Sequence, residues 1–204
     1  MTPSYIHPTA IVDSHEVGAG TRIWAYAHVL SGAVIGENCN IGNHAYVEAG
    51  ARIGNNVTLK NQVCVWDGVA LDDDVFVGPC VAFTNDLYPR SPRMPHVRER
   101  YASKSNWLVP TVVEQGATIG ANATIVGGLR LGRYCMVAAG AVVTRDVEPF
   151  ALVVGAPARK LGHVCRCGQR LGETFPDTQC LSCGATAELF RQGVGTVETE
   201  ATRS

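Results

Sequence analysis

Two residues of this chain, Asp67 and Asn85, have side chains that could hold an amine, and they lie eighteen residues apart. A carboxylate and an amide oxygen both accept hydrogen bonds from N–H groups, and a carboxylate can also take a proton from a reacting amine. A hydroxyl acceptor would instead need a stronger base, typically a histidine. None of the six histidines shares the eighteen-residue phase of this pair: His7, His15, His28, His44, His96 and His163. The pair favours transfer to an amine, with two solvated turn residues as the alternative.

A long basic segment, residues 84–112, contains Asn85 and interrupts the pattern of the chain around it. Its four prolines are expected to prevent regular strand or helix through most of its length. It carries five basic residues against two acidic ones. A projecting arm of this charge suits phosphate or carboxylate groups of a ligand, although a solvated loop would have the same composition. Candidate ligand contacts are Asp86, Arg90 and Arg93, with His28 at a turn as a further ligand contact or a structural residue.

Four cysteines lie close together near the end of the chain, as Cys165 and Cys167 followed by Cys180 and Cys183. A glycine directly follows each pair and permits the tight turn that aims backbone amides at thiolate sulfurs. Four sulfurs suit tetrahedral zinc, although the first pair has one intervening residue where two are usual. The sequence predicts a structural zinc site in a ribbon-like tail at 164–190. The alternative is the same ribbon without metal.

The elements that position these residues follow from a period of six. Branched aliphatic residues recur at every sixth position from Ile11 to Val77, Phe83 continues the series, and the pattern resumes in phase from Val113 to Val143. A second column two positions earlier is small or β-branched, except at His15. Neither a helix nor a flat strand has this period. Three hexads form one triangular coil of eighteen residues, so stacked coils place Asp67 directly below Asn85, about 5 Å apart. Ile11 and His15 are accordingly expected to point inward.

Small residues dominate the outer positions of the last coils, as in GATIGANATIV. Small side chains leave backbone amides and carbonyls open to an extended ligand. The segment VVGAPARKLG then supplies two adjacent cations. This region is the expected binding surface for a long anionic ligand, and its candidate contacts are Ala121, Ala139, Gly140, Arg159 and Lys160.

Composition limits the classes of partner. The net charge is −1 at neutral pH, so neither nucleic acid nor a membrane surface is expected as a partner. The first twelve residues lack a basic start and a long apolar run, which predicts no signal peptide and a cytoplasmic protein. Residues 1–163 are expected to form one domain with its arm at 84–112, residues 164–190 the ribbon-like tail, and residues 191–204 a disordered end.

The hexads, the FTNDLYPRS segment, the arm and VVGAPARKLG together resemble the left-handed β-helix acyltransferases of the hexapeptide-repeat superfamily. Within it they most resemble the nucleotide-sugar N-acetyltransferases that act on a 3-amino sugar, such as the UDP-2-acetamido-3-amino-2,3-dideoxy-glucuronate enzymes. The resemblance implies an all-β, left-handed parallel β-helix, a homotrimer, and acetyl-CoA bound between neighbouring prisms. It also assigns the amine contacts to Asn85 and to Asp67, in a position where the family commonly has Glu.

The expected activity is therefore acetyl transfer from acetyl-CoA to the 3-amino group of a nucleotide-linked amino sugar, in the synthesis of surface polysaccharide such as lipopolysaccharide O-antigen. A UDP-3-amino-glucuronate derivative is the favoured substrate and a dTDP-3-amino-deoxysugar the second. Sugar O-acylation and a non-enzymatic β-helical scaffold are the alternatives. A scaffold would need neither the basic arm nor the Asp67 and Asn85 pair beneath it.

Overall fold

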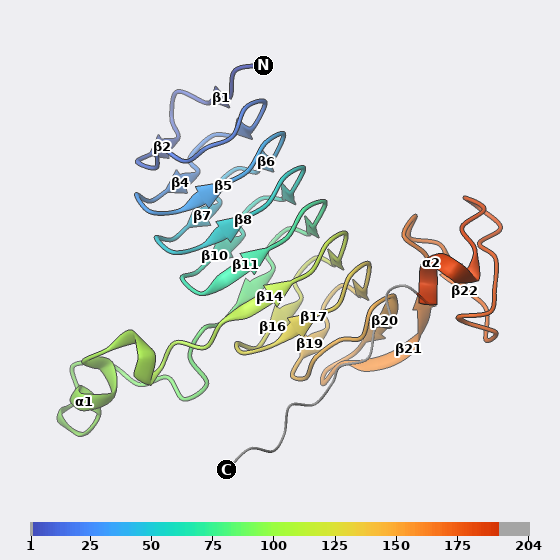
Figure 1. The fold of residues 1–204 in the computed structure, drawn as a ribbon. Helices are drawn as coiled ribbons and strands as arrows, with labels where there is room; N and C mark the ends of the chain where they lie inside the picture. The colour runs from blue at the N-terminus through green and yellow to red at the C-terminus, as the bar shows by residue number, and fades with distance from the viewer. Residues whose placement is uncertain (1, 192–204) are drawn as a thin grey trace, which may run out of the picture.

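The computed structural model describes residues 2–191, which form a three-sided column of stacked coils (Figure 1). Its strands are two to four residues long within the column and run parallel from coil to coil. Sheet A contains β1 (Tyr5–Ile6), β3 (Arg22–Ile23), β6 (Asn40–Ile41), β9 (Thr58–Leu59), β12 (Phe76–Val77), β15 (Thr118–Ile119), β18 (Met136–Val137) and β20 (Ala151–Val154). Sheet B contains β2 (Ile11–Val12), β4 (His28–Val29), β7 (Tyr46–Val47), β10 (Cys64–Val65), β13 (Ala82–Phe83), β16 (Thr124–Ile125) and β19 (Val142–Val143). Sheet C contains β5 (Val34–Ile35), β8 (Arg52–Ile53), β11 (Val69–Leu71), β14 (Thr111–Val113) and β17 (Arg130–Leu131).

The eighteen-residue coil predicted from the hexads is confirmed by the strand register. Val47 pairs with Val65 in sheet B, and Ile41 pairs with Leu59 in sheet A. The second residue of these strands points inward, and the column from Ile23 to Val143 is almost completely buried. Each buried Val, Ile or Leu side chain contributes about 1.5–3 kcal/mol relative to exposure. Cys39 and Cys135 fill small inward positions, and burial raises the pKa of Cys135 to about 12, so it stays a thiol.

The first coil departs from the predicted frame by one residue. Val12, and not Ile11, pairs with the buried Val29, and Ile11 is 55% exposed. His15 is exposed, and Ser14 is buried in its place with its Oγ donating to the carbonyl of Ala33 (2.6 Å). The prediction that Ile11 and His15 point inward is therefore wrong. Adjacent apolar residues made two frames equally plausible, and the backbone bonds to the second coil decide between them.

The B–C and A–B edges of the column differ in their turn residues. At the edge between sheets B and C, which we call the B–C edge, a glycine with positive φ follows the corner in four coils: Gly32, Gly50, Gly68 and Gly128. The A–B edge uses residues such as Gln62 and Asn122 in the same left-handed conformation. Glycine has no Cβ, and at Gly50 the space that a Cβ would take is occupied by the Asp67 carboxylate.

The arm, residues 84–112, leaves the column between β13 and β14 and projects from it (Figure 1). It contains η1 (Pro95–Val97), α1 (Arg98–Tyr101) and η2 (Lys104–Asn106). Its base is closed by an antiparallel bridge between Asp86 and Leu108. The prolines were expected to prevent regular strand or helix through most of the arm. Residues 84–94 contain neither, and the three short helices lie between Pro95 and Asn106. β14 begins at Thr111, which places the last residues of the predicted segment in sheet C.

The tail begins with a hairpin of β20 and β21 (Arg159–Val164), followed by β22 (Arg170–Leu171) and α2 (Ala187–Arg191). β21 crosses the predicted boundary between residues 163 and 164. The tail packs on the last coil through a separate apolar cluster that includes Phe150, Phe175 and Phe190. Arg191 ends α2, so the predicted disordered end does not start there; residues 192–204 lie outside the described part of the chain. No helix within residues 2–191 has the length and apolar character needed to cross a bilayer.

Candidate acyl-acceptor site

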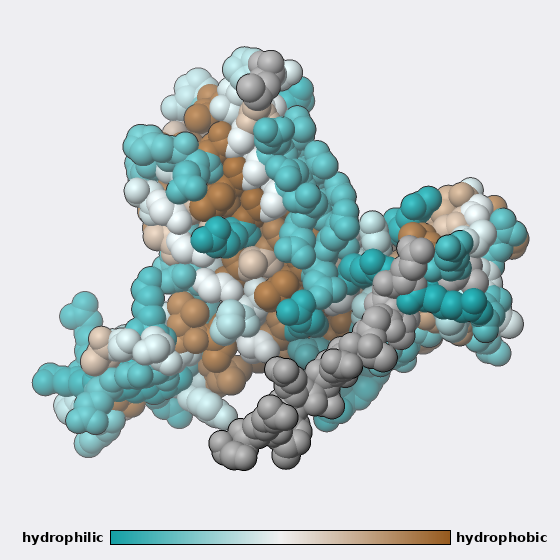
Figure 2. All heavy atoms as spheres, viewed as in Figure 1, coloured by the Kyte–Doolittle hydropathy of each residue, from teal (hydrophilic) through white to brown (hydrophobic). Residues whose placement is uncertain are grey.

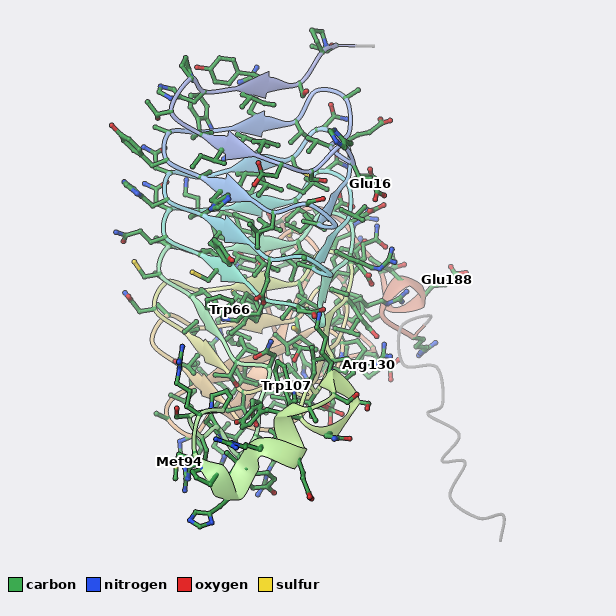
Figure 3. All side chains as sticks on the ribbon, turned by 90° about the vertical axis from the view of Figure 1, so that its left-hand side faces the viewer. Glu16, Trp66, Met94, Trp107, Arg130 and Glu188 are labelled. Atoms are coloured by element: carbon green, nitrogen blue, oxygen red, sulfur yellow. The ribbon has the colours of Figure 1, made fainter. Side chains whose placement is uncertain are left out.

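Asn85 lies directly above Asp67 on the B–C edge, as the period predicts. The two residues follow β13 and β10, which are neighbours in sheet B. The Asn85 side-chain amide donates to the main-chain carbonyl of Asp67 (3.1 Å). This bond fixes the amide so that its oxygen is left to accept a hydrogen bond from a ligand. Figure 3 looks at the column from the side from which the arm projects, with Trp66, the neighbour of Asp67, on the coils.

Asp67 is positioned by three contacts that the sequence pattern did not reveal. Its backbone N–H donates to Glu48 Oε2 (2.8 Å), and its Oδ2 forms an ion pair with Lys104 from the arm. Its Oδ1 lies over Gly50, where a Cβ atom would approach it to 2.1 Å. The Asp67 side chain is 18% exposed and the Lys104 side chain 71%. The sequence did not identify Glu48, Gly50 and Lys104 as site residues, because only their contacts with Asp67 in the fold mark them as such.

Asp86 organises the arm. Its carboxylate accepts hydrogen bonds from the Arg100 guanidinium and from the hydroxyl of Tyr101 (2.7 Å). Arg100 also donates to the carbonyl of Tyr88. Burial opposes ionisation of Asp86, but the bonds from Arg100 and Tyr101 hold the pKa of its carboxyl below the ordinary value. With these partners satisfied, Asp86 holds the base of the arm in shape, and its predicted contact with a sugar stays a prediction.

Arg90, Arg93 and His28 are not gathered at Asp67 in this chain. Arg90 and Arg93 are exposed on the arm, where Arg90 donates to the carbonyl of Pro89 (2.9 Å). Figure 2 shows the strongly hydrophilic surface of the arm. His28 lies on the outer face of sheet B, 3.3 Å from the Asp13 carboxylate. A row of aromatic contacts runs from His28 through Tyr46 to Trp66, with ring centroids 5.7 and 5.6 Å apart.

The candidate contacts for a long ligand lie on a different edge. Ala121, Ala139 and Gly140 stack at the A–B edge, where Gly140 N–H donates to the carbonyl of Ala121 (2.8 Å). Arg159 and Lys160 line a pocket of about 190 Å³ at the end of the column. Lys160 also pairs with Glu148. Sheet B separates Ala121, Ala139 and Gly140 from Asp67 within one chain, and Arg159 and Lys160 lie at the end of the column. The two halves of the predicted site therefore do not meet in a single protomer.

The four tail cysteines converge. Their sulfur atoms all lie within 4.8 Å of one another, with 3.5 Å between Cys165 and Cys183 and 3.7 Å between Cys167 and Cys180. Sulfurs bound tetrahedrally to zinc at about 2.3 Å are about 3.8 Å apart, so the set fits that metal. The backbone N–H of Cys183 lowers the pKa of Cys180 to about 7, whereas burial raises that of Cys165 to about 12. The short spacing of the first pair does not prevent convergence.

The chain is similar to known bacterial transferases in sequence. The profile of the bacterial transferase hexapeptide family (six repeats) matches residues 14–49 and 110–145. The dTDP-3-amino-3,6-dideoxy-alpha-D-galactopyranose 3-N-acetyltransferase of Aneurinibacillus thermoaerophilus is 48% identical over 181 residues, 88% of each chain. A 2,3,4,5-tetrahydropyridine-2,6-dicarboxylate N-acetyltransferase of Brevibacillus brevis is 49% identical over 55 residues, 27% of this chain and 23% of that one.

Among solved structures, the acetyltransferase domain of PglB from Neisseria gonorrhoeae FA1090 has a TM-score of 0.51 and 22% identity, covering 78% of this chain and 58% of that one. At this identity the likeness supports the fold alone. The similarity to the Aneurinibacillus enzyme covers 88% of this chain. This chain therefore belongs to the hexapeptide-repeat family of bacterial transferases and is an acyltransferase.

Proposed function

We propose that this protein transfers the acetyl group of acetyl-CoA to the 3-amino group of a nucleotide-linked amino sugar. The observation that carries the proposal is the position of Asn85 directly above Asp67, with its side-chain amide bonded to the Asp67 main-chain carbonyl and the Asp67 carboxylate packed over Gly50. The preferred substrate is a dTDP-linked 3-amino-3,6-dideoxyhexose, because the relative that is similar over 88% of this chain carries that activity in its name. This choice replaces the UDP-glucuronate derivative favoured by the sequence motifs alone.

The chemistry needs an unprotonated amine held in line with a thioester carbonyl. The amine nitrogen forms a bond to the acetyl carbon, the carbon–sulfur bond breaks, and CoA leaves as a thiolate. The nitrogen then loses one proton, which Asp67 accepts or passes to the departing thiolate. Asn85 orients the amine through its side-chain oxygen. A sugar amine has a pKa nearer the α-amino value of about 8 than the lysine value, so little base strength is required.

The separation of the two candidate surfaces supports a homotrimer in the proposal. The acceptor residues lie on the B–C edge, whereas Ala121, Ala139 and Gly140 lie on the A–B edge. An assembly that faces the B–C edge of one prism toward the A–B edge of the next would complete a site from two chains. Arg159 and Lys160 would then bind phosphates of acetyl-CoA at the end of that cleft. We place the reaction in the cytoplasm, where acetyl-CoA and reduced cysteines are found.

The tail cysteines form the second part of the proposal. Cys165, Cys167, Cys180 and Cys183 would hold one structural zinc ion, and the tail would fold around it. The zinc would contribute to stability and not to transfer, because all four cysteines lie in the tail, where Cys165 and Cys180 belong to its apolar cluster, and not on the B–C edge. Metal analysis of protein purified without chelator should find about one zinc per chain. A value far below one would leave the ribbon without metal.

The activity is tested by thiol release from acetyl-CoA with a panel of dTDP- and UDP-linked 3-amino sugars and their 3-hydroxy counterparts. Amine-dependent release is expected, and Asn85→Ala and Asp67→Ala should each lower turnover ten-fold or more without changing the oligomer. Asn55→Ala, at a corner between sheets C and A where Asn55 accepts the backbone N–H of Glu37 (2.8 Å), is the control. Release with the hydroxyl sugars would favour O-acylation, and silence across the panel would favour a scaffold.

A further inference from the structure

The B–C edge holds two carboxylates at the place where an amine is expected to react. Asp67 stands at the corner, and Glu48 of the preceding coil accepts its backbone N–H (2.8 Å). Within residues 2–191, one basic side chain forms an ion pair with these two carboxylates. It is Lys104 of the arm, which binds Asp67 Oδ2. Lys104 comes from η2, a three-residue 3-10 helix, and reaches a residue 37 positions earlier in the chain.

Two carboxylates alone would work against acetyl transfer. A nearby negative charge favours the protonated form of an amine, and an ammonium group has no lone pair with which to attack a thioester. The same carboxylate is nevertheless useful as a hydrogen-bond acceptor that orients the amine. A positive charge beside Asp67 resolves this conflict, because it cancels the field of the carboxylate while leaving an oxygen free for the amine.

The geometry of Lys104 suits that role. It binds Oδ2 of Asp67, and no hydrogen bond within residues 2–191 involves Oδ1, which occupies the space left by the missing side chain of Gly50. The hydrogen bond that Lys104 donates to Asp67 raises the pKa of Lys104 above its ordinary value, so the side chain is a cation at neutral pH. The other charged groups of the arm base, Asp86 and Arg100, are paired with each other.

We propose that Lys104 is a positioning residue of the acceptor site, whose charge keeps the bound sugar amine unprotonated while Asp67 orients it. This inference rests on the proposed function. It assigns a task to the arm: the arm carries the cation that makes an acidic corner compatible with an amine nucleophile.

The test is the pH dependence of single-turnover acetyl transfer at saturating acetyl-CoA and amino sugar. In the full-length protein the rate should fall on the acid side as the bound amine becomes protonated. Lys104→Met should move that acid limb upward by about one pH unit, at the lower end of the effect of a neighbouring charge because Lys104 is largely exposed. Lys104→Arg should restore the wild-type limb. Arg98→Met removes an exposed arm charge that does not touch Asp67 and is the matched control.

Three results would overturn the inference. An unshifted acid limb with a lower rate in Lys104→Met would mean that Lys104 only anchors the arm. An unshifted limb with a lower KM for the amino sugar would mean that Lys104 occupies the amine subsite and is displaced by substrate. An equal shift in Arg98→Met would assign the effect to the net charge of the arm. Absence of transfer by the wild-type protein is a different outcome, which would refute the proposed function itself.

Discussion

Replacing Gly50 by alanine should separate the stability of the B–C edge from its chemistry. Gly50 has φ +91°, and an added Cβ would lie 2.1 Å from Asp67 Oδ1 and 2.8 Å from its Cγ. Gly32, one coil earlier on the same edge, has φ +85°, and its added Cβ would meet only Ala49 Cβ at 3.7 Å, an ordinary contact. The two glycines therefore share the backbone strain and differ in the clash with the Asp67 carboxylate.

The expected magnitudes follow from that difference. A non-glycine residue held in this region of φ costs roughly 1–3 kcal/mol, so both variants should lose a similar part of the free energy of unfolding. For a chain of this length that corresponds to a fall in Tm of about 2–4 °C per kcal/mol. Only Gly50→Ala must also move the Asp67 carboxylate by an ångström or more. A displacement of about 1 Å in a reacting geometry can cost up to 100-fold in rate, and we expect at least ten-fold.

The assay combines thermal unfolding with thiol release at saturating acetyl-CoA and dTDP-linked amino sugar, measured well below Tm. Gly32→Ala should keep near-normal turnover, and Gly50→Ala should lose ten-fold or more at a comparable Tm. Equal turnover in the two variants would show that Asp67 does not need its observed position. A large loss in Gly32→Ala would show that the whole edge, and not the Asp67 carboxylate, sets the rate.

Three further predictions concern the column, the arm and the tail. Leu59→Ala should lower the free energy of unfolding by about 2–5 kcal/mol in chemical denaturation, because Leu59 is fully buried and alanine leaves a cavity. Asp86→Asn should speed tryptic cleavage of the arm at neutral pH. Because Arg100 and Tyr101 lower the pKa of Asp86, the stability that the ionised carboxylate gives the arm is present above about pH 4 and is lost as the pH falls through the lowered pKa. Hydrogen exchange of the arm across this pH range would follow that loss. Removal of metal by a chelator should lower the Tm of the tail transition in calorimetry and leave acetyl transfer on the B–C edge within two-fold of the untreated protein.

The candidate site was only partly open to prediction from sequence. Asp67 and Asn85 could be paired because an eighteen-residue coil converts their spacing into a contact, and the cysteines because sulfur ligands have few alternatives. Lys104 could not be assigned, since it lies in a segment without periodicity and its reach to Asp67 depends on the fold of the arm. The contacts of Asp86 with Arg100 and Tyr101 arise inside the same segment and were equally hidden.

The sequence by itself determined the coil, its three faces, the buried column from Ile23 to Val143 and the relation of Asp67 to Asn85, because a strict repeat turns distance along the chain into position in space. Only the tertiary structure decided the frame of the first coil, where Ile11 and Val12 are both apolar and hydrogen bonds to the second coil select Val12. It also decided which charges meet at the edge. Such contacts join residues without a common period, so their positions depend on the folded arm and not on the repeat.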